Sequence, residues 1–110
     1  MSNGDVIAER LLHLGGSAQA TIPVRLERPV PDGNDYRCYY SMGWTTGEYR
    51  GYAIGIDAFQ SIIFALQRIG TEIYTSKAHK EEHLYWLEMG GGFGFLLPDN
   101  LSDLREGDDK

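Results

Sequence analysis

Apolar and polar side chains alternate over two stretches near the start of the chain, a pattern that predicts a β-hairpin. In residues 20–28 every second position from Ile22 to Leu26 is apolar, which places these side chains on one face of a strand. Residues 6–14 are mainly apolar and lead into a Gly-Gly pair, so we expect them to form the partner strand. A helix capped by Asp5 remains the alternative for that segment.

Prolines set two further expectations for this region. Pro23 has no N–H to donate to a ladder, so we expect its strand to lie at a sheet edge or to contain a bulge. Residues 29–35 combine two prolines with an Asp-Gly-Asn sequence, each of which restricts or reverses the backbone. We therefore expect an exposed loop between two hairpins.

A second hairpin is predicted by alternation in residues 36–44 and 49–56, with a Thr-Thr-Gly turn between them. One face of its second strand carries three small side chains in alternate positions. Because that spacing lets another element approach the sheet closely, we expect a helix to lie there. The small residues are Gly51, Ala53 and Gly55.

A helical repeat follows the second hairpin. Asp57 is a favourable N-cap, and Gln60 three residues later completes a capping-box pattern. We expect an amphipathic helix over residues 57–76, with one apolar stripe facing the sheet. Phe64 falls outside the stripe, where a loop covers it or a protein–protein contact uses it. The stripe consists of Phe59, Ile62, Ile63, Leu66, Ile69 and Ile73.

The rest of the chain predicts little further structure. Leu84–Glu88 reads as a short strand, and residues 93–97 as a last strand closed by proline. Residues 99–110 carry five acidic and two basic side chains, so we expect a partly disordered acidic tail. The fold expected for residues 1–98 is a single α+β domain. It comprises an antiparallel four-stranded meander, one long helix on one sheet face, and one or two short C-terminal strands.

Composition narrows the choice of partners. The 110 residues carry a net charge of −6, and most of the acid lies in the second half. Because nucleic-acid binding needs clustered Lys and Arg, we expect no nucleic-acid partner. No apolar run approaches the roughly 18 residues of a membrane span, and the first residues do not resemble a signal peptide. With a single cysteine, Cys38, these features predict a cytoplasmic protein without a membrane partner.

A candidate metal site lies in the charged segment after the predicted helix. His79 and His83 frame the H-x-x-E-H pattern of inverted zinc peptidases, with Glu82 as the acidic residue. That chemistry needs a helix under the motif, whereas these residues join a helix to a strand. Weak metal binding by the two histidines is therefore favoured over catalysis, and we expect no catalytic residue and no cofactor.

Tyrosine and arginine gather on the sheet face that the predicted helix leaves uncovered. Tyr39 shares that face with Arg37 and Ser41, and Arg25 and Arg50 can join them. Because interfaces are enriched in tyrosine and arginine, we predict that Arg37 and Tyr39 contact a second copy or another protein. The alternative is that tyrosine, being amphipathic, tolerates partial exposure. Phe64 on the helix is the third predicted interface residue.

Several short motifs together resemble a small bacterial family of about this length whose function is uncharacterised. The resemblance covers residues 6–98 and implies an α+β fold without a known activity. Its motifs are Ile7-Ala-Glu-Arg10, Arg28-Pro-Val-Pro31, Gly55-Ile-Asp-Ala-Phe-Gln60, Ala65-Leu-Gln-Arg-Ile-Gly70 and Gly92-Phe-Gly-Phe95.

These features predict a non-catalytic protein-interaction or binding domain that forms a homodimer. Two other functions remain open. The first is a small metal-dependent hydrolase or ligand-binding enzyme that uses His79, Glu82 and His83. The second is an acidic immunity or chaperone-like antagonist of a basic partner, which the net charge of −6 favours.

Overall fold

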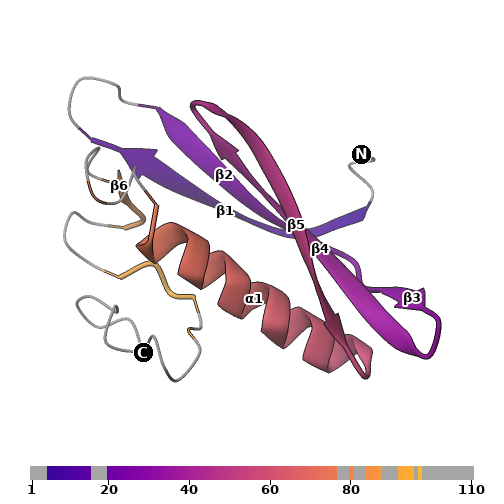
Figure 1. Ribbon diagram of the computed structural model, residues 1–110. Helices are drawn as coiled ribbons and strands as arrows, with labels where there is room; N and C mark the ends of the chain where they lie inside the picture. Colours follow the sequence, from indigo (N-terminus) through magenta and orange to yellow (C-terminus); the bar gives the residue numbers. More distant parts are fainter. Residues whose placement is uncertain are drawn as a thin grey trace. The chain divides into compact units, whose positions relative to one another are not determined.

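The computed structural model describes residues 5–15, 20–76, 80, 84–87, 92–95 and 97. The described chain is α+β, as predicted, with an antiparallel sheet and one helix (Figure 1). The elements are β1 (Val6–Leu14), β2 (Thr21–Glu27), β3 (Val30–Asp32), β4 (Asp35–Trp44), β5 (Gly47–Gly55), α1 (Ala58–Tyr74) and β6 (Leu84–Tyr85).

Strand β4 organises the sheet. It pairs with β5 along one edge, and with β2 and β3 at successive positions of the other edge. Strand β1 lies next to β2 and pairs in turn with β6. The three pairings of β4, with β2, β3 and β5, and the pairing of β6 with β1 are all antiparallel. The predicted four-stranded meander is therefore matched in part: β1, β2, β4 and β5 are neighbours in that order, and the additional short strand β3 follows β2 in the chain and pairs with β4.

The first segment, residues 6–14, is a strand and not the alternative helix. The expectation that Pro23 marks an edge strand is wrong, because β2 lies between β1 and β4. The pairing of β2 with β4 begins at Val24, one residue after the proline, so the missing N–H breaks no bond in that ladder. Gly43 makes room for the ring, since a Cβ there would lie 2.9 Å from Cγ of Pro23.

The expectation of a loop over residues 29–35 is also wrong. Its residues Val30–Asp32 form β3, which turns through Gly33 and Asn34 into β4. Gly33 has a φ of 64°, the left-handed conformation that a tight two-residue turn requires. The prolines do not prevent the strand, because their fixed φ is compatible with a short extended segment.

The chain divides into two compact units, each with its own buried apolar side chains. One comprises Met1–Arg10 with Pro23–Ala65, and the other comprises Leu11–Ile22 with Leu66–Lys110. The buried apolar residues of the first are Val24, Leu26, Cys38, Tyr40, Met42, Ala53 and Ala65. Those of the second are Leu12, Leu14, Ile22, Ile69, Ile73, Tyr74, Leu84, Phe93 and Leu97.

The predicted cap opens α1. The N–H of Gln60 donates to the Asp57 carboxylate over 2.8 Å, and the Gln60 side chain accepts the N–H of Ile56 over 2.8 Å. The start of the helix then passes directly over the end of β5. A Cβ at Gly55 would collide with the backbone N of Ser61, so glycine is required for this approach. The predicted close approach of the helix to the small residues is thus confirmed at Gly55, whereas a Cβ at Gly51 would meet the side chains of Tyr40 and Tyr49.

The predicted apolar stripe is wrong for the first half of α1. Phe59 is 80% exposed and Ile63 44% exposed, whereas Ser61 and Ala65 are fully buried. Because the helix backbone lies so close to β5, the side that faces the sheet must carry small side chains. Farther along the helix, the stripe is confirmed at Ile69 and Ile73, which are buried.

The C-terminal strands are shorter than expected. The predicted strand from residue 84 is limited to Leu84–Tyr85, which pairs with His13 and Leu14 of β1. The prediction of a last strand over residues 93–97 is wrong, because the described residues of this range form no strand. Gly94 has a φ of 74°, which breaks an extended conformation. The predicted tail, residues 99–110, lies outside the described residues.

No helix in the described part of the chain is both long and apolar enough to cross a membrane.

Candidate functional site

The hairpin of β4 and β5 presents two different faces. The first half of α1 packs on the face that carries Cys38, Ala53 and Gly55 (Figure 1). The opposite face carries no helix in the part of the chain that the structure describes. We call four side chains on this uncovered face the Tyr–Arg cluster: Arg37, Tyr39, Arg50 and Tyr52.

Strand pairing brings the cluster together. The two-residue turn Thr45–Thr46 sets the register of the hairpin, so that Tyr39 lies opposite Tyr52. The same register places Arg37 opposite Ile54 and Arg50 opposite Ser41. Since opposite residues of an antiparallel pair share a face, the cluster forms a compact group of side chains.

Each arginine of the cluster stacks on a tyrosine. The Cζ atom of Arg50 lies 3.8 Å from the centre of the Tyr39 ring, and that of Arg37 lies 4.4 Å from the Tyr52 ring. Arg37 also donates through Nη1 to the Tyr39 hydroxyl over 3.2 Å. Cation–π contacts at exposed sites contribute about 0.5–1 kcal/mol each. The stacking therefore holds four large side chains in defined positions before any partner binds.

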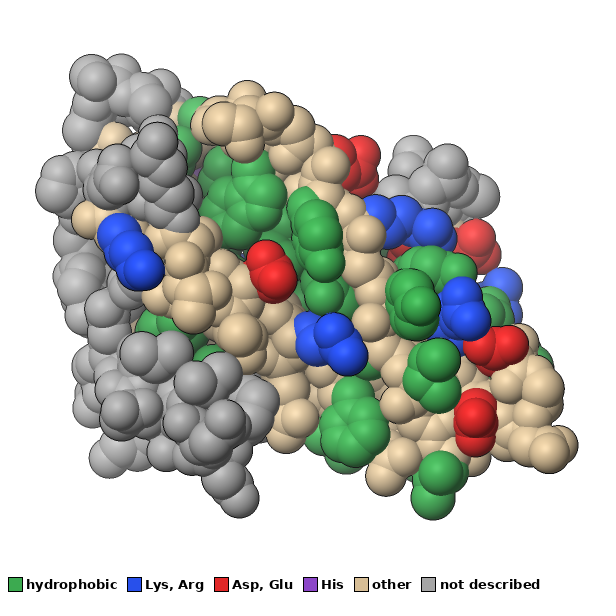
Figure 2. All heavy atoms as spheres, viewed as in Figure 1, with side chains coloured by type: hydrophobic (Ala, Val, Ile, Leu, Met, Phe, Trp, Pro, Cys, Tyr) green, Lys and Arg blue, Asp and Glu red, His purple; other side chains and the backbone are tan. Residues whose placement is uncertain are grey.

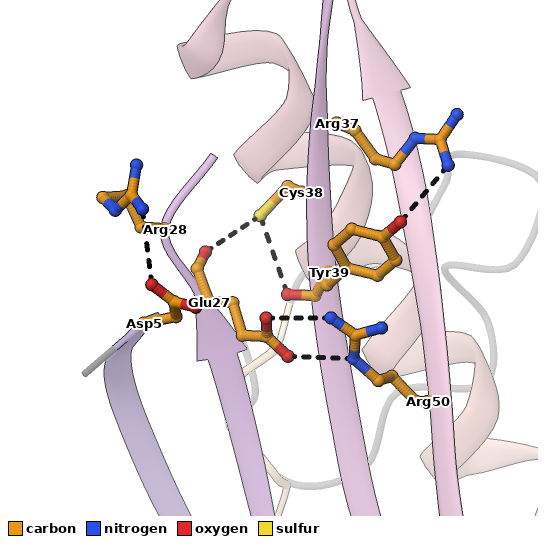
Figure 3. Close-up of polar contacts among 7 residues, drawn as sticks. All are labelled: Asp5, Glu27, Arg28, Arg37, Cys38, Tyr39 and Arg50. Carbon is orange, nitrogen blue, oxygen red and sulfur yellow. Dashed lines mark hydrogen bonds and ion pairs between the residues drawn. The ribbon is translucent and has the colours of Figure 1, made fainter. Parts of the chain in front are cut away.

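A carboxylate also binds each guanidinium group of the cluster. Arg50 donates through Nε and Nη2 to the two carboxylate oxygens of Glu27, both over 3.1 Å (Figure 3). Arg37 donates through Nε and Nη2 to Oδ2 of Asp32, over 3.1 Å and 2.7 Å. The hydrogen bond to Glu27 raises the pKa of Arg50. Hydrogen bonds to Tyr39 and then Asp32 raise the pKa of Arg37. Both guanidinium groups carry a positive charge, as arginine does over the whole pH range in which proteins are folded.

Four arginines of this part of the chain each pair with a carboxylate. Besides the two pairs of the cluster, Arg25 bonds Glu9 over 2.6 Å and Arg28 bonds Asp5 over 3.3 Å. Exposed pairs of this kind contribute little stability. In a chain whose net charge is −6, each of these four arginines is thus offset by a carboxylate.

Apolar side chains are exposed beside the cluster. Tyr52 is 45% exposed, and its neighbour on the same face, Ile54, is 42% exposed. Ile7 of β1 is exposed to a similar degree. Figure 2 shows hydrophobic side chains lying next to basic and acidic ones on the face of the molecule in view. Aromatic, aliphatic and guanidinium groups in contact are the composition of the buried centres of protein interfaces.

The structure brings most of the predicted interface residues together. Arg37 and Tyr39 lie on the uncovered face as expected, and Arg25 and Arg50 lie on it too. Ser41 is 1% exposed and so offers no surface. Phe64 is partly exposed on α1, which packs on the other side of the hairpin, so it is not part of the cluster.

Sequence reasoning missed the parts played by Tyr52 and Glu27. Alternation places Tyr52 and Ile54 on one face of their strand, but linking Tyr52 to Tyr39 requires the register of the hairpin. The two-residue turn carries that information, since it fixes every pair of the hairpin. Nothing local marks Glu27, whose buried carboxylate is explained only by Arg50 from a distant strand.

The predicted metal site cannot be placed. His79, Glu82 and His83 lie outside the described residues, so metal binding there stays a prediction. Within the described residues, no group of three or more His, Cys, Asp or Glu side chains could hold a metal ion.

Cys38 lies on the helix side of β4 and is fully buried. Its thiol donates to the backbone oxygen of Glu27 over 3.4 Å (Figure 3). Burial, and secondarily the charge of Glu27, raises the pKa of the thiol to about 11. Because the thiolate is the reactive form, this cysteine is a poor nucleophile near neutral pH.

Comparison with known proteins gives one match. A family model described as a domain of unknown function, DUF6968, matches residues 8–97. This span agrees with the resemblance to an uncharacterised family seen in the sequence, whose bacterial origin stays a prediction. No curated protein and no solved structure matches the chain.

Proposed function

Because the chain belongs to the DUF6968 family, whose description names no activity, we propose a function from its own surface. The protein is a non-catalytic interaction domain that works as a homodimer, with the Tyr–Arg cluster at the contact between the copies. The observation that carries this proposal is the stacked set of two tyrosines and two arginines on the uncovered face.

Preorganisation supports this use of the cluster. Binding normally costs conformational entropy, because long side chains must be immobilised at the contact. Here stacking on tyrosine and pairing with Asp32 or Glu27 hold both arginines in the unbound chain. Tyr and Arg are also the residue types that most often dominate binding energy in alanine scans.

Charge balance supports a second copy as the partner. Two chains of net charge −6 repel each other over most surfaces. The ion pairs around the cluster lessen this repulsion locally, because each of four carboxylates there is matched by an arginine. The clusters of two copies can therefore lie side by side without bringing unpaired arginines together.

Native mass spectrometry at micromolar concentration tests the proposal. We expect a dimer for the unmodified chain, and at least a tenfold weaker dimer for the Tyr52→Ala/Ile54→Thr variant, since about 1.4 kcal/mol of lost contact energy gives that factor. The matched control is Phe59→Ser, which removes a more exposed aromatic ring from α1. A monomer, or a dimer weakened only by the control substitution, would contradict the proposal.

A further inference from the structure

Within the described residues, one edge of strand β5 has no partner strand. Among the described residues it pairs only with β4, and it runs for nine residues, Gly47–Gly55. Long regular edge strands are commonly protected from further pairing by proline, lysine or a bulge. Strand β5 contains neither proline nor lysine, and it pairs with β4 without interruption over its whole length.

The register shows which backbone groups point away from β4. In a hairpin with a two-residue turn, the closing pair, here Trp44 with Gly47, exchanges two hydrogen bonds, and every second pair after it does the same. The odd-numbered residues of β5 therefore bond to β4. The N–H and C=O groups that point outward belong to Glu48, Arg50, Tyr52 and Ile54.

We infer that this edge pairs antiparallel with the same edge of a second copy, with Gly51 on the two-fold axis. The inference rests on the proposed homodimer and names the element that forms it. In this arrangement all nine residues of β5 pair, and each outward-pointing residue meets another. Arg50 lies opposite Tyr52 of the second copy, and Glu48 lies opposite its Ile54.

Side chains on the uncovered face are complementary in this register. Within one chain, arginine already stacks on tyrosine at 3.8 Å and 4.4 Å across the β4–β5 pair. Arg50 opposite a second Tyr52 repeats that kind of contact across the new boundary. The Tyr–Arg clusters of the two copies then lie beside each other on one continuous sheet.

The helix-side face is complementary as well. Gly51 meets Gly51 at the axis, and Tyr49 lies opposite Ala53, so no two large side chains face each other on this side. Shifting the axis to Arg50 would place the two Arg50 side chains directly opposite each other. Shifting it to Tyr49 would pair only five of the nine residues. The axis at Gly51 combines the longest pairing with the fewest conflicts.

Engineered cysteines test whether the β5 edges of two copies pair, and in which register. Glu48 and Ile54 are exposed, lie six positions apart on one strand, and become opposite neighbours between copies. Opposite Cα atoms in such a pair are about 5.5 Å apart, within the range for a disulfide. Under mild oxidation, we expect Glu48→Cys/Ile54→Cys to become a covalent dimer on a non-reducing gel, with most of the protein crosslinked.

Matched variants separate the possible outcomes. Each single substitution should crosslink at least tenfold less, and Glu48→Cys/Tyr52→Cys reports the register centred on Arg50. Native mass spectrometry of the unmodified chain is recorded alongside, and circular dichroism confirms that each variant is folded. A dimer without the Glu48–Ile54 crosslink, or with equal or stronger crosslinking in a matched variant, would overturn the edge pairing and leave the homodimer standing. A monomer would overturn both.

Discussion

The two faces of the β4–β5 hairpin come from the same two strands, yet they differ in almost every physical property. Toward α1 the hairpin presents small or fully buried side chains, such as Ala53, Gly55 and Cys38. Away from α1 it presents long side chains that combine charge with aromatic rings, such as Arg50 and Tyr52. On the first face, the close approach of the α1 backbone restricts the size of the side chains. On the second face, no such restriction applies, and long side chains extend toward solvent.

This difference shows where substitutions should matter for folding and where they should matter for association. Crowding the helix side displaces backbone, which cannot move without breaking hydrogen bonds. Changing the uncovered side alters groups that already touch water. Four predictions, from the largest effect to the smallest, test that contrast.

The largest effect is expected at Gly55. Gly55→Val adds a side chain where a single Cβ already collides with the backbone N of Ser61, so we expect a loss of about 3 kcal/mol in the free energy of unfolding. Urea denaturation measures it. The matched control is Ile54→Val, one residue away on the other face, for which we expect less than about 1 kcal/mol. Equal losses in both variants would remove the contrast between the faces.

A loss of about 2 kcal/mol is expected for Arg50→Met, because the carboxylate of Glu27 is left without its cation. The Glu27 side chain is 5% exposed, so water cannot replace the guanidinium. Adding Glu27→Gln to that variant should recover part of the loss, since the buried charge is then gone. A double-mutant cycle of unfolding free energies checks this. A double variant less stable than Arg50→Met would contradict the account.

The thiol of Cys38 should respond to pH in a defined window. Burial raises its pKa from 9.0 to about 11, which favours the protonated form in the folded chain. The resulting stability is fully present below pH 9 and is lost as the pH rises through about 11. Labelling with a thiol reagent at pH 8 should therefore require unfolding of the chain. Rapid labelling of the folded protein at pH 8 would show that the thiol is accessible.

The smallest effect is expected for the Arg25–Glu9 pair. Its partners are 36% and 42% exposed, so Arg25→Gln should change the free energy of unfolding by no more than about 0.5 kcal/mol. High salt should reduce that change further. Thermal unfolding at two salt concentrations is the measurement. A larger loss would mean that this face also supports the fold.

Local patterns predicted most of the elements, but not β3, which was expected to be a loop. Alternation predicted the strands, and the Asp57–Gln60 cap marked the start of α1. The small residues of β5 predicted where the helix would lie. They did not predict which side of the helix would face the sheet, because a count of apolar residues favours Phe59 over Ser61. Side-chain size decides which side of the helix faces the sheet, because the backbones of α1 and β5 lie very close together at Gly55.

The cluster was predicted only in part for a related reason. Arg37 and Tyr39 share one strand, so alternation alone places them on one face. Linking them to Tyr52 requires the hairpin register, and linking Glu27 to Arg50 requires the order of β2, β4 and β5 in the sheet. Such pairings are set by hydrogen bonds between strands, which no short stretch of sequence contains.

The contact of Gly55 with Ser61 also bears on how the chain folds. These residues are six positions apart, and the β4–β5 turn closes over two residues, so both contacts form with little loss of loop entropy. Pairing of β4 with β2 joins residues farther apart in the chain and is slower to form. Folding is therefore expected to begin in the segment from Asp35 to Ser61, onto which the earlier strands are added.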